Sequence, residues 1–179
     1  MSDFTEKDYK IFEMFEKDWA LATAGTLEHF NSCTIAWGML GTTWVKPGNG
    51  GEVAMIFLYP TRHTLEFAQQ SDQFTISFFP KSYKKMLGYM GTHSGRDGDK
   101  AAACDLTPVA MGESVTYEEA NLIFLCKKLY QHQIAKEDLA PEIQEFYAVQ
   151  PGIFPRDENG DWQTHWVFIG RIIDVDDRR

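Results

Sequence analysis

Three consecutive residues, Arg62, His63 and Thr64, stand where an apolar segment gives way to a short amphipathic one. The first turn of a helix has free backbone N–H groups and a partial positive charge. A guanidinium and a hydroxyl at that position make a good seat for a phosphate. The same residues also fit plain helix capping, with Arg62 solvated and His63 packed on the surface. Both interpretations stay open on these residues alone.

A second polar segment runs along a predicted strand and ends in a tryptophan. Asn31, Ser32, Cys33 and Thr34 supply amide, hydroxyl and thiol groups, and Trp37 follows. A strand of this kind suits a flat heterocycle that has a polar edge at one end and an apolar edge at the other. The alternative is an ordinary strand, because Thr34 has high β propensity and Trp37 is a typical core residue.

Ser77, Phe78 and Phe79 end another predicted strand. Paired phenylalanines are usually core residues, and a ring-stacking role is the alternative.

A loop follows that has two glycines and alternating charges. Ser94, the Gly95 backbone and Lys100 could meet a phosphate or a sugar chain. The alternative is a solvated turn in which Arg96 or Lys100 pairs with neighbouring aspartates.

Several other site classes lack their signatures. The five histidines show no metal-ligand spacing, so we assign no metal ligands, and the three cysteines form no CxxC pair. No GxSxG segment supports a hydrolase, and no GxGxxG follows a strand. His165 is expected to be a buried, hydrogen-bonded imidazole.

Composition narrows the class of protein. The 179 residues are 44% hydrophobic, 14% aromatic and 24% charged, with a net charge of −9. These values predict a globular domain, and the negative charge disfavours nucleic acid or an anionic membrane as partner. We find no signal peptide or membrane span in the sequence and expect a cytoplasmic protein with free thiols.

Periodicity predicts mostly strands. An N-terminal helical extension is expected over residues 1–25, with Phe12, Phe15 and Trp19 on one face, and a second domain over 26–179. The expected strands cover 33–45 (long or bulged), 53–59, 74–79, 114–117, 122–131 and 162–174, with a turn at 47–51. Short helices are expected at 61–70, 82–90 and 138–148. Six or seven strands with short helices between them favour an antiparallel barrel.

The residues of these segments and their order along the chain resemble those of one protein family. NSCTIAWGMLGTTWVKP, PTRHT, TISFFP, YKKMLGYMGTHSGRDGDK, EEANLIFLCKKLY and HWVFIGRI are similar to the flavin reductase-like, FMN-binding split barrels, in the flavoredoxin-type branch. The resemblance covers residues 30 to 175.

The resemblance implies a mainly β, six-stranded antiparallel split barrel that binds FMN and forms a homodimer. It implies that residues 31–37 face the flavin ring and ribityl chain, and that Arg62, His63 and Thr64 hold the phosphate. Ser77, Phe78 and Phe79 would supply backbone contacts, and Ser94, Gly95 and Lys100 would close the site.

The activity implied is that of an NAD(P)H-dependent flavin reductase, in which hydride passes from the nicotinamide to FMN and then to an electron acceptor or a monooxygenase partner. The flavin carries this chemistry, so no catalytic side chain is required. Two alternatives remain: an FMN-binding electron carrier with little NAD(P)H activity, and a non-enzymatic ligand-binding barrel.

Overall fold

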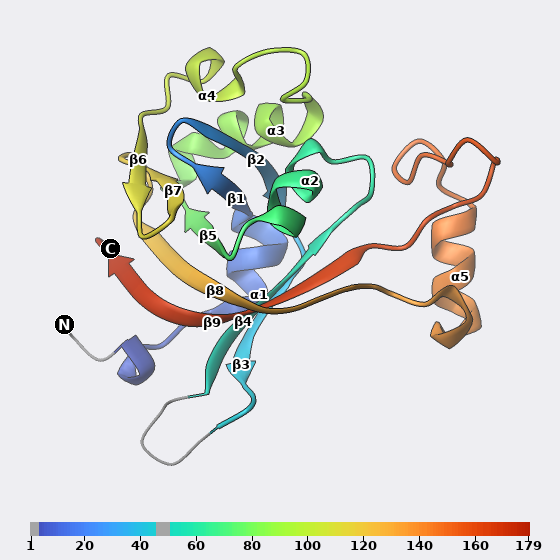
Figure 1. The fold of residues 1–179 in the computed structure, drawn as a ribbon, viewed down its shortest axis with the longest axis horizontal. Coiled ribbons are helices and arrows are strands. Elements are labelled where there is room, and N and C mark those ends of the chain that lie inside the picture. Colours follow the sequence, from blue (N-terminus) through green and yellow to red (C-terminus); the bar gives the residue numbers. More distant parts are fainter. Residues whose placement is uncertain (1–3, 46–50) are drawn as a thin grey trace.

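The computed structural model describes residues 4–45 and 51–179, and one large antiparallel sheet dominates them (Figure 1). Its seven strands follow the order β2-β1-β5-β8-β9-β4-β3, and β6 and β7 form a separate hairpin. The strands are β1 (Ala20–Thr26), β2 (His29–Ile35), β3 (Gly38–Thr42), β4 (Glu52–Leu58), β5 (Gln73–Phe78), β6 (Pro108–Met111), β7 (Ser114–Tyr117), β8 (Leu122–Gln133) and β9 (Trp166–Asp177). The mainly β class is confirmed, with seven strands in the sheet in place of six.

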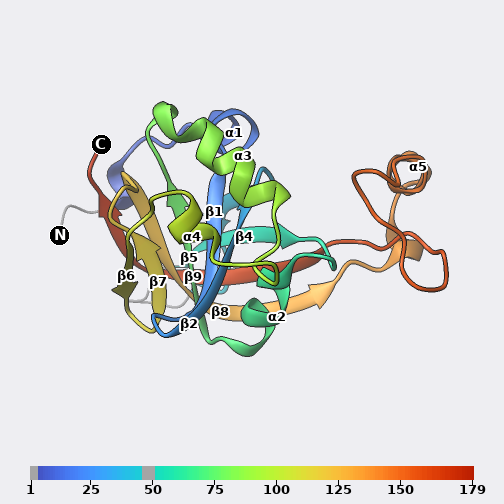
Figure 2. The same ribbon diagram turned by 90° about the horizontal axis from the view of Figure 1, so that it is seen from above.

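The helices are all short. They are α1 (Ile11–Glu13), α2 (His63–Gln70), α3 (Lys84–Thr92), α4 (Lys100–Ala103) and α5 (Pro141–Ala148), with a π-helical turn at Met14–Asp18 and 3-10 turns at Phe4–Glu6, Lys81–Tyr83 and Lys136–Asp138. α3 and α4 cover one side of the barrel, whereas α5 lies far from it, at the end of the ribbon formed by β8 and β9 (Figures 1 and 2). Within the described ranges, no helix is long and apolar enough to cross a membrane.

The sheet is an open barrel whose two ends are joined by the chain itself. β2 and β3 stand at opposite ends of the strand order, yet only Ala36 and Trp37 separate them in sequence. The expected single strand over residues 33–45 is therefore wrong: it is two strands, because the chain turns at Ala36 and Trp37. This turn brings β2 next to β4 and places Trp37 at the split.

The expected N-terminal helix is also shorter than predicted. Helical turns end at Asp18, and Ala20–Thr26 forms β1, between β2 and β5 in the sheet. This strand was missed because its first five residues are all buried and show no alternation of apolar and polar side chains. Trp19 marks the change, with a left-handed φ of 67°. The division into two domains stays a prediction.

β1 requires a glycine close to its turn into β2. Gly25 has a φ of 108°, and a Cβ there would lie 2.3 Å from the carbonyl oxygen of His29. The resulting register places Thr23 opposite Ser32, and their hydroxyl oxygens lie 2.7 Å apart. Most of the expected turn at 47–51, between β3 and β4, lies outside the described residues.

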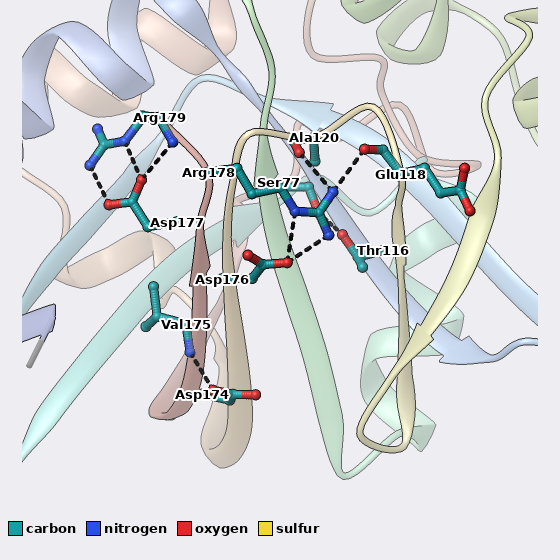
Figure 3. Close-up of polar contacts among 10 residues, drawn as sticks. All are labelled: Ser77, Thr116, Glu118, Ala120, Asp174, Val175, Asp176, Asp177, Arg178 and Arg179. Carbon is teal, nitrogen blue, oxygen red and sulfur yellow. Dashed lines mark hydrogen bonds and ion pairs between the residues drawn. The ribbon is translucent and has the colours of Figure 1, made fainter. Parts of the chain in front are cut away.

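Polar contacts fasten the C-terminal end of β9 (Figure 3). Asp177 accepts hydrogen bonds from Lys7 at 2.9 Å and from Arg179, and its carboxylate is only 7% exposed. Hydrogen bonds from Arg179 and Lys7 hold the pKa of Asp177 well below its usual range. Arg178 donates to Asp176 and to the backbone carbonyl of Glu118. The last strand is thus tied to the N-terminal segment and to the chain before β8.

Candidate functional site

Consecutive residues of β2 line two adjoining hollows. Asn31 and Ser32 line a cavity of about 250 Å³, which Lys100 and Tyr117 also border, and we call it the lysine pocket. The next residues of the chain, 33–37, line a cleft of about 340 Å³ between the ends of β2 and β4 and the segment that carries α5. We call this the tryptophan cleft, and its volume lies within the range of small-molecule sites, roughly 300–1,000 Å³.

Lys100 is the buried cation of the lysine pocket. It is the first residue of α4 and is only 7% exposed. Nζ donates to the carbonyl oxygen of Ser32 at 2.6 Å and to that of Met90 at 3.2 Å. Burial lowers the pKa of this amine. Among the described residues, no carboxylate lies within ion-pair distance of Lys100. An ammonium has three donors, so one is left for an anion.

Arg62 is the corresponding cation of the tryptophan cleft. It occupies the N-cap position of α2, and Nη1 donates to the carbonyl oxygen of Gly91 at 2.5 Å. In the described part of the chain it too has no carboxylate partner. Two cations without counter-ions therefore border β2, which is an arrangement that favours an anionic ligand.

Thr64 joins the first turn of α2 to β2. It is buried, and its hydroxyl donates to the side-chain oxygen of Asn31 at 2.8 Å. The Cys33 thiol also hydrogen-bonds with Thr64, but burial is the larger effect and raises the pKa of Cys33. The thiol is consequently protonated and unsuited to nucleophilic chemistry. Thr34 is turned toward α3, with its hydroxyl donating to the carbonyl oxygen of Leu87 at 2.5 Å.

The loop over residues 93–99 lies against β2 and α2. A Cβ on Gly95 would lie 1.8 Å from Nδ2 of Asn31, so only glycine fits this approach. Arg96 pairs with Glu66 of α2, and not with the aspartates of its own loop. The Ser94 hydroxyl accepts a hydrogen bond from the Arg96 amide at 3.2 Å. The loop is therefore bound to the strand and helix that carry Asn31 and Thr64.

Other predicted site residues lie elsewhere. His63 borders a separate hollow with His29 and Phe67, where burial lowers its pKa and Nδ1 has no partner among the described residues. Ser77 is fully buried, with its hydroxyl 2.9 Å from that of Thr116 (Figure 3). Phe78 packs in the barrel core, and Phe79 lines a hollow beside α3. The structure does not bring these four residues to the lysine pocket or the tryptophan cleft.

Aromatic rings surround Trp37 in the tryptophan cleft. Its indole is 39% exposed and lies 4.4 Å from the imidazole of His165, centroid to centroid. The rings of Phe57, Phe146 and Phe154 each lie 6.3 Å from it. Such a surface suits one face or edge of a flat ring.

His165 is the buried imidazole that the sequence predicted. Its Nδ1 lies 2.6 Å from the hydroxyl of Tyr147, and burial with the charge of Arg62 lowers the pKa of His165 to about 4. Tyr117, Tyr147 and Phe154 were missed by sequence reasoning. Each sits in a segment with no site motif, and only the tertiary fold brings it to β2 or to Trp37.

The chain is similar to one protein family in sequence and to several solved proteins in structure. A model of the flavin reductase like domain matches residues 52–179. No curated protein sequence matches the chain significantly. Similar solved structures include an FMN-binding protein from Thermus thermophilus with bound 1-cyclohex-2-enone (19% identity, TM-score 0.63, covering 89% of this chain and 70% of that one). Flavoredoxin from Methanosarcina acetivorans is 15% identical, with a TM-score of 0.63 over 89% of this chain and 68% of its own.

A third similar structure is nitrilotriacetate monooxygenase component B from Bacillus cereus, at 13% identity and a TM-score of 0.62, covering 99% of this chain and 80% of that one. At these identities the structural likeness establishes the fold. The family match spans most of the chain, from β4 to the last residue. The chain therefore belongs to the flavin reductase like domain family.

Proposed function

We propose that this protein binds FMN along β2 and acts as a flavin reductase with NAD(P)H as reductant. The observation that carries the proposal is a pair of cations, Lys100 and Arg62, that have no carboxylate partner among residues 4–45 and 51–179 and lie beside a polar strand that leads into an aromatic cleft. FMN has the matching parts: a phosphate, a polyol chain and a flat ring. Family membership supports the same ligand.

The residues that fit FMN are those that border the two hollows. Lys100 and Arg62 would hold the phosphate by charge-assisted hydrogen bonds. Asn31, Ser32, Cys33, Thr34 and Gly95 line the path between, and Trp37 would contact the ring. Thr64 acts one step away, because it orients the amide of Asn31.

FMN, when bound, supplies the hydride-accepting chemistry, so the chain itself needs no acid or base. The work left to the chain is to bind the phosphate, orient the ring and limit access of water. The aromatic walls of the tryptophan cleft serve the last two purposes. The electron acceptor would be a monooxygenase component or another electron-transfer protein, in keeping with the monooxygenase component among the similar structures.

Self-association belongs to the same proposal. An apolar hollow of about 350 Å³ lies between the N-terminal helical turns and β3. Phe12 is 88% exposed beside it, and Met39 is 52% exposed. Exposed apolar surface of this kind marks interfaces. We propose that a second copy of the chain covers it, and that Phe12→Asp gives a monomer in sedimentation velocity.

Anaerobic visible spectroscopy tests the function. FMN is added to the purified protein, followed by NADH or NADPH, with free FMN at the same concentration as the control. Bleaching much faster than in the control is expected. Flavin that binds but bleaches only with dithionite would favour an electron carrier. A protein that leaves the FMN spectrum and fluorescence unchanged would refute flavin binding.

A further inference from the structure

The segment that joins β8 to β9 has a small aromatic core of its own. Tyr147 of α5, Phe154 and Tyr59 are buried together, with Trp162 packed against them. This cluster is separate from the barrel core, in keeping with the position of α5 away from the barrel (Figure 2). His165 lies between the cluster and Trp37, and therefore forms part of the wall of the tryptophan cleft.

The hydrogen bond between Tyr147 and His165 has one favourable direction. The Tyr147 hydroxyl lies 2.6 Å from Nδ1 of His165, and both residues are buried. Burial raises the pKa of Tyr147, so the hydroxyl keeps its proton at neutral pH. The described residues offer this proton no acceptor other than Nδ1, so the hydroxyl donates to the imidazole.

This direction determines which ring nitrogen carries the proton. In a neutral imidazole one nitrogen accepts and the other is an N–H donor. With Nδ1 accepting from Tyr147, the proton is on Nε2. The opposite tautomer would leave the Tyr147 proton without an acceptor, because the described residues offer the hydroxyl no other one. An unused donor proton in a buried site would be costly.

We propose that Tyr147 is a positioning residue that holds His165 neutral with its proton on Nε2, so that the tryptophan cleft presents a fixed N–H donor beside the Trp37 ring. The donor would select a planar ligand that carries a carbonyl oxygen or an unprotonated ring nitrogen at its edge. Among the described residues none hydrogen-bonds to Nε2, and this atom is not among the fully enclosed polar atoms that lack a partner. The donor is therefore open to the cleft.

The charged surroundings keep the imidazole neutral. Among the residues that the structure describes, the titratable groups that face His165 are Arg62, Tyr59 and Tyr147, and none of them is a carboxylate. Burial and the Arg62 charge both lower its pKa, to about 4. At neutral pH the residue is thus a hydrogen-bond donor of constant charge. Only the identity of the ligand rests on the proposed function, because the tautomer is a property of the ligand-free protein.

Long-range ¹H–¹⁵N NMR of the ligand-free protein tests the proposal, because it distinguishes protonated from unprotonated imidazole nitrogens. In the wild type we expect His165 to show a protonated Nε2 and an unprotonated Nδ1. In Tyr147→Phe we expect the two nitrogens to move toward averaged shifts, and the pKa of His165 to rise as its neutral form loses a hydrogen bond. An unprotonated Nε2 in the wild type would overturn the proposal, whether or not the variant folds.

Tyr59→Phe is the matched control. Tyr59 belongs to the same cluster, its ring lies 5.2 Å from that of His165, and its hydroxyl donates to the carbonyl oxygen of Pro155 at 2.9 Å. It should leave the tautomer of His165 unchanged. An equal change in both variants would assign the effect to cluster packing and refute the role of Tyr147. Failure of the protein to bind FMN would leave this result standing, so the two proposals are separable.

Discussion

Replacement of Lys100 by methionine separates ligand binding from stability. Methionine keeps an apolar stem of similar length but removes the ammonium that donates to the carbonyl oxygens of Ser32 and Met90. If the third donor holds the FMN phosphate, the variant loses one charge-assisted hydrogen bond, worth about 1.5–3 kcal/mol. At 1.4 kcal/mol for each factor of ten, this predicts an FMN dissociation constant roughly 10- to 150-fold higher.

The stability change is expected to be smaller than a lost pair of bonds implies. The two hydrogen bonds stabilise the fold, but the buried ammonium costs free energy because no described carboxylate pairs with it. These effects oppose each other, so Lys100→Met should lose at most about 2 kcal/mol of unfolding free energy in urea. A folded variant is therefore available for binding measurements.

Lys128→Met is the matched control. Lys128 also donates to two carbonyl oxygens, those of Ala68 and Gln69, at 2.9 and 2.8 Å, and burial lowers its pKa as well. It lies at the far end of α2 and borders neither hollow. Fluorescence titration with FMN and with riboflavin, which lacks the phosphate, gives the readout. Lys100→Met should weaken the binding of FMN but not that of riboflavin. Lys128→Met should weaken the binding of neither ligand. Equal weakening of riboflavin, or unchanged FMN affinity, would refute the phosphate assignment.

Three further changes probe other parts of the structure. Arg62→Ala should weaken FMN binding by about 1.5–3 kcal/mol and leave riboflavin binding unchanged. Weaker binding of both ligands would show that Arg62 does not contact the phosphate. Gly95→Ala should lower FMN affinity at least tenfold, because the loop must leave β2. Gly88→Ala, with open space around its Cβ, should not. Asp177→Asn should lose about 1 kcal/mol at neutral pH. Because the folded pKa of Asp177 is depressed, this contribution is complete above the unfolded value and is lost as pH falls through the folded one. A difference from wild type that persists at the lowest pH would contradict it.

Segments with one dominant pattern were predicted well from the sequence. The continuous apolar run at residues 53–59 matches β4, Glu52–Leu58, in which every residue is buried or half-buried. The amphipathic segment at residues 61–70 matches α2, His63–Gln70. Both predictions depend on local information alone.

β1 and β6 could not be predicted in the same way. β1 is rich in alanine and glycine, which have low β propensity, and it is a strand because β2 and β5 flank it. β6 is four residues long, begins at Pro108 and, among the described strands, pairs with β7 alone. Tertiary context overrides propensity in both cases.

The residues of the candidate site also differ in whether the local sequence indicates them. Asn31, Arg62 and Lys100 could be proposed from the sequence because each lies in a local segment whose residue types suggest a ligand. Tyr117 and Tyr147 could not be proposed in this way, since each contributes one hydroxyl from a remote segment. The Tyr117 hydroxyl lies 2.6 Å from that of Ser32, and its pKa is raised to about 12 by burial. A single tyrosine of this kind has no spacing to detect.

The net charge of the chain and the local charge beside β2 have opposite signs. The chain carries a net charge of −9, which taken alone disfavours an anionic ligand. Lys100 and Arg62 nevertheless lie beside β2 without carboxylate partners in the described part of the chain, and burial strengthens their effect on nearby atoms. Arg62 and His165 both border the tryptophan cleft, and the charge of Arg62 lowers the pKa of His165. Recognition of an anion at β2 depends on the positions of these two cations. The net surface charge instead affects association with larger partners.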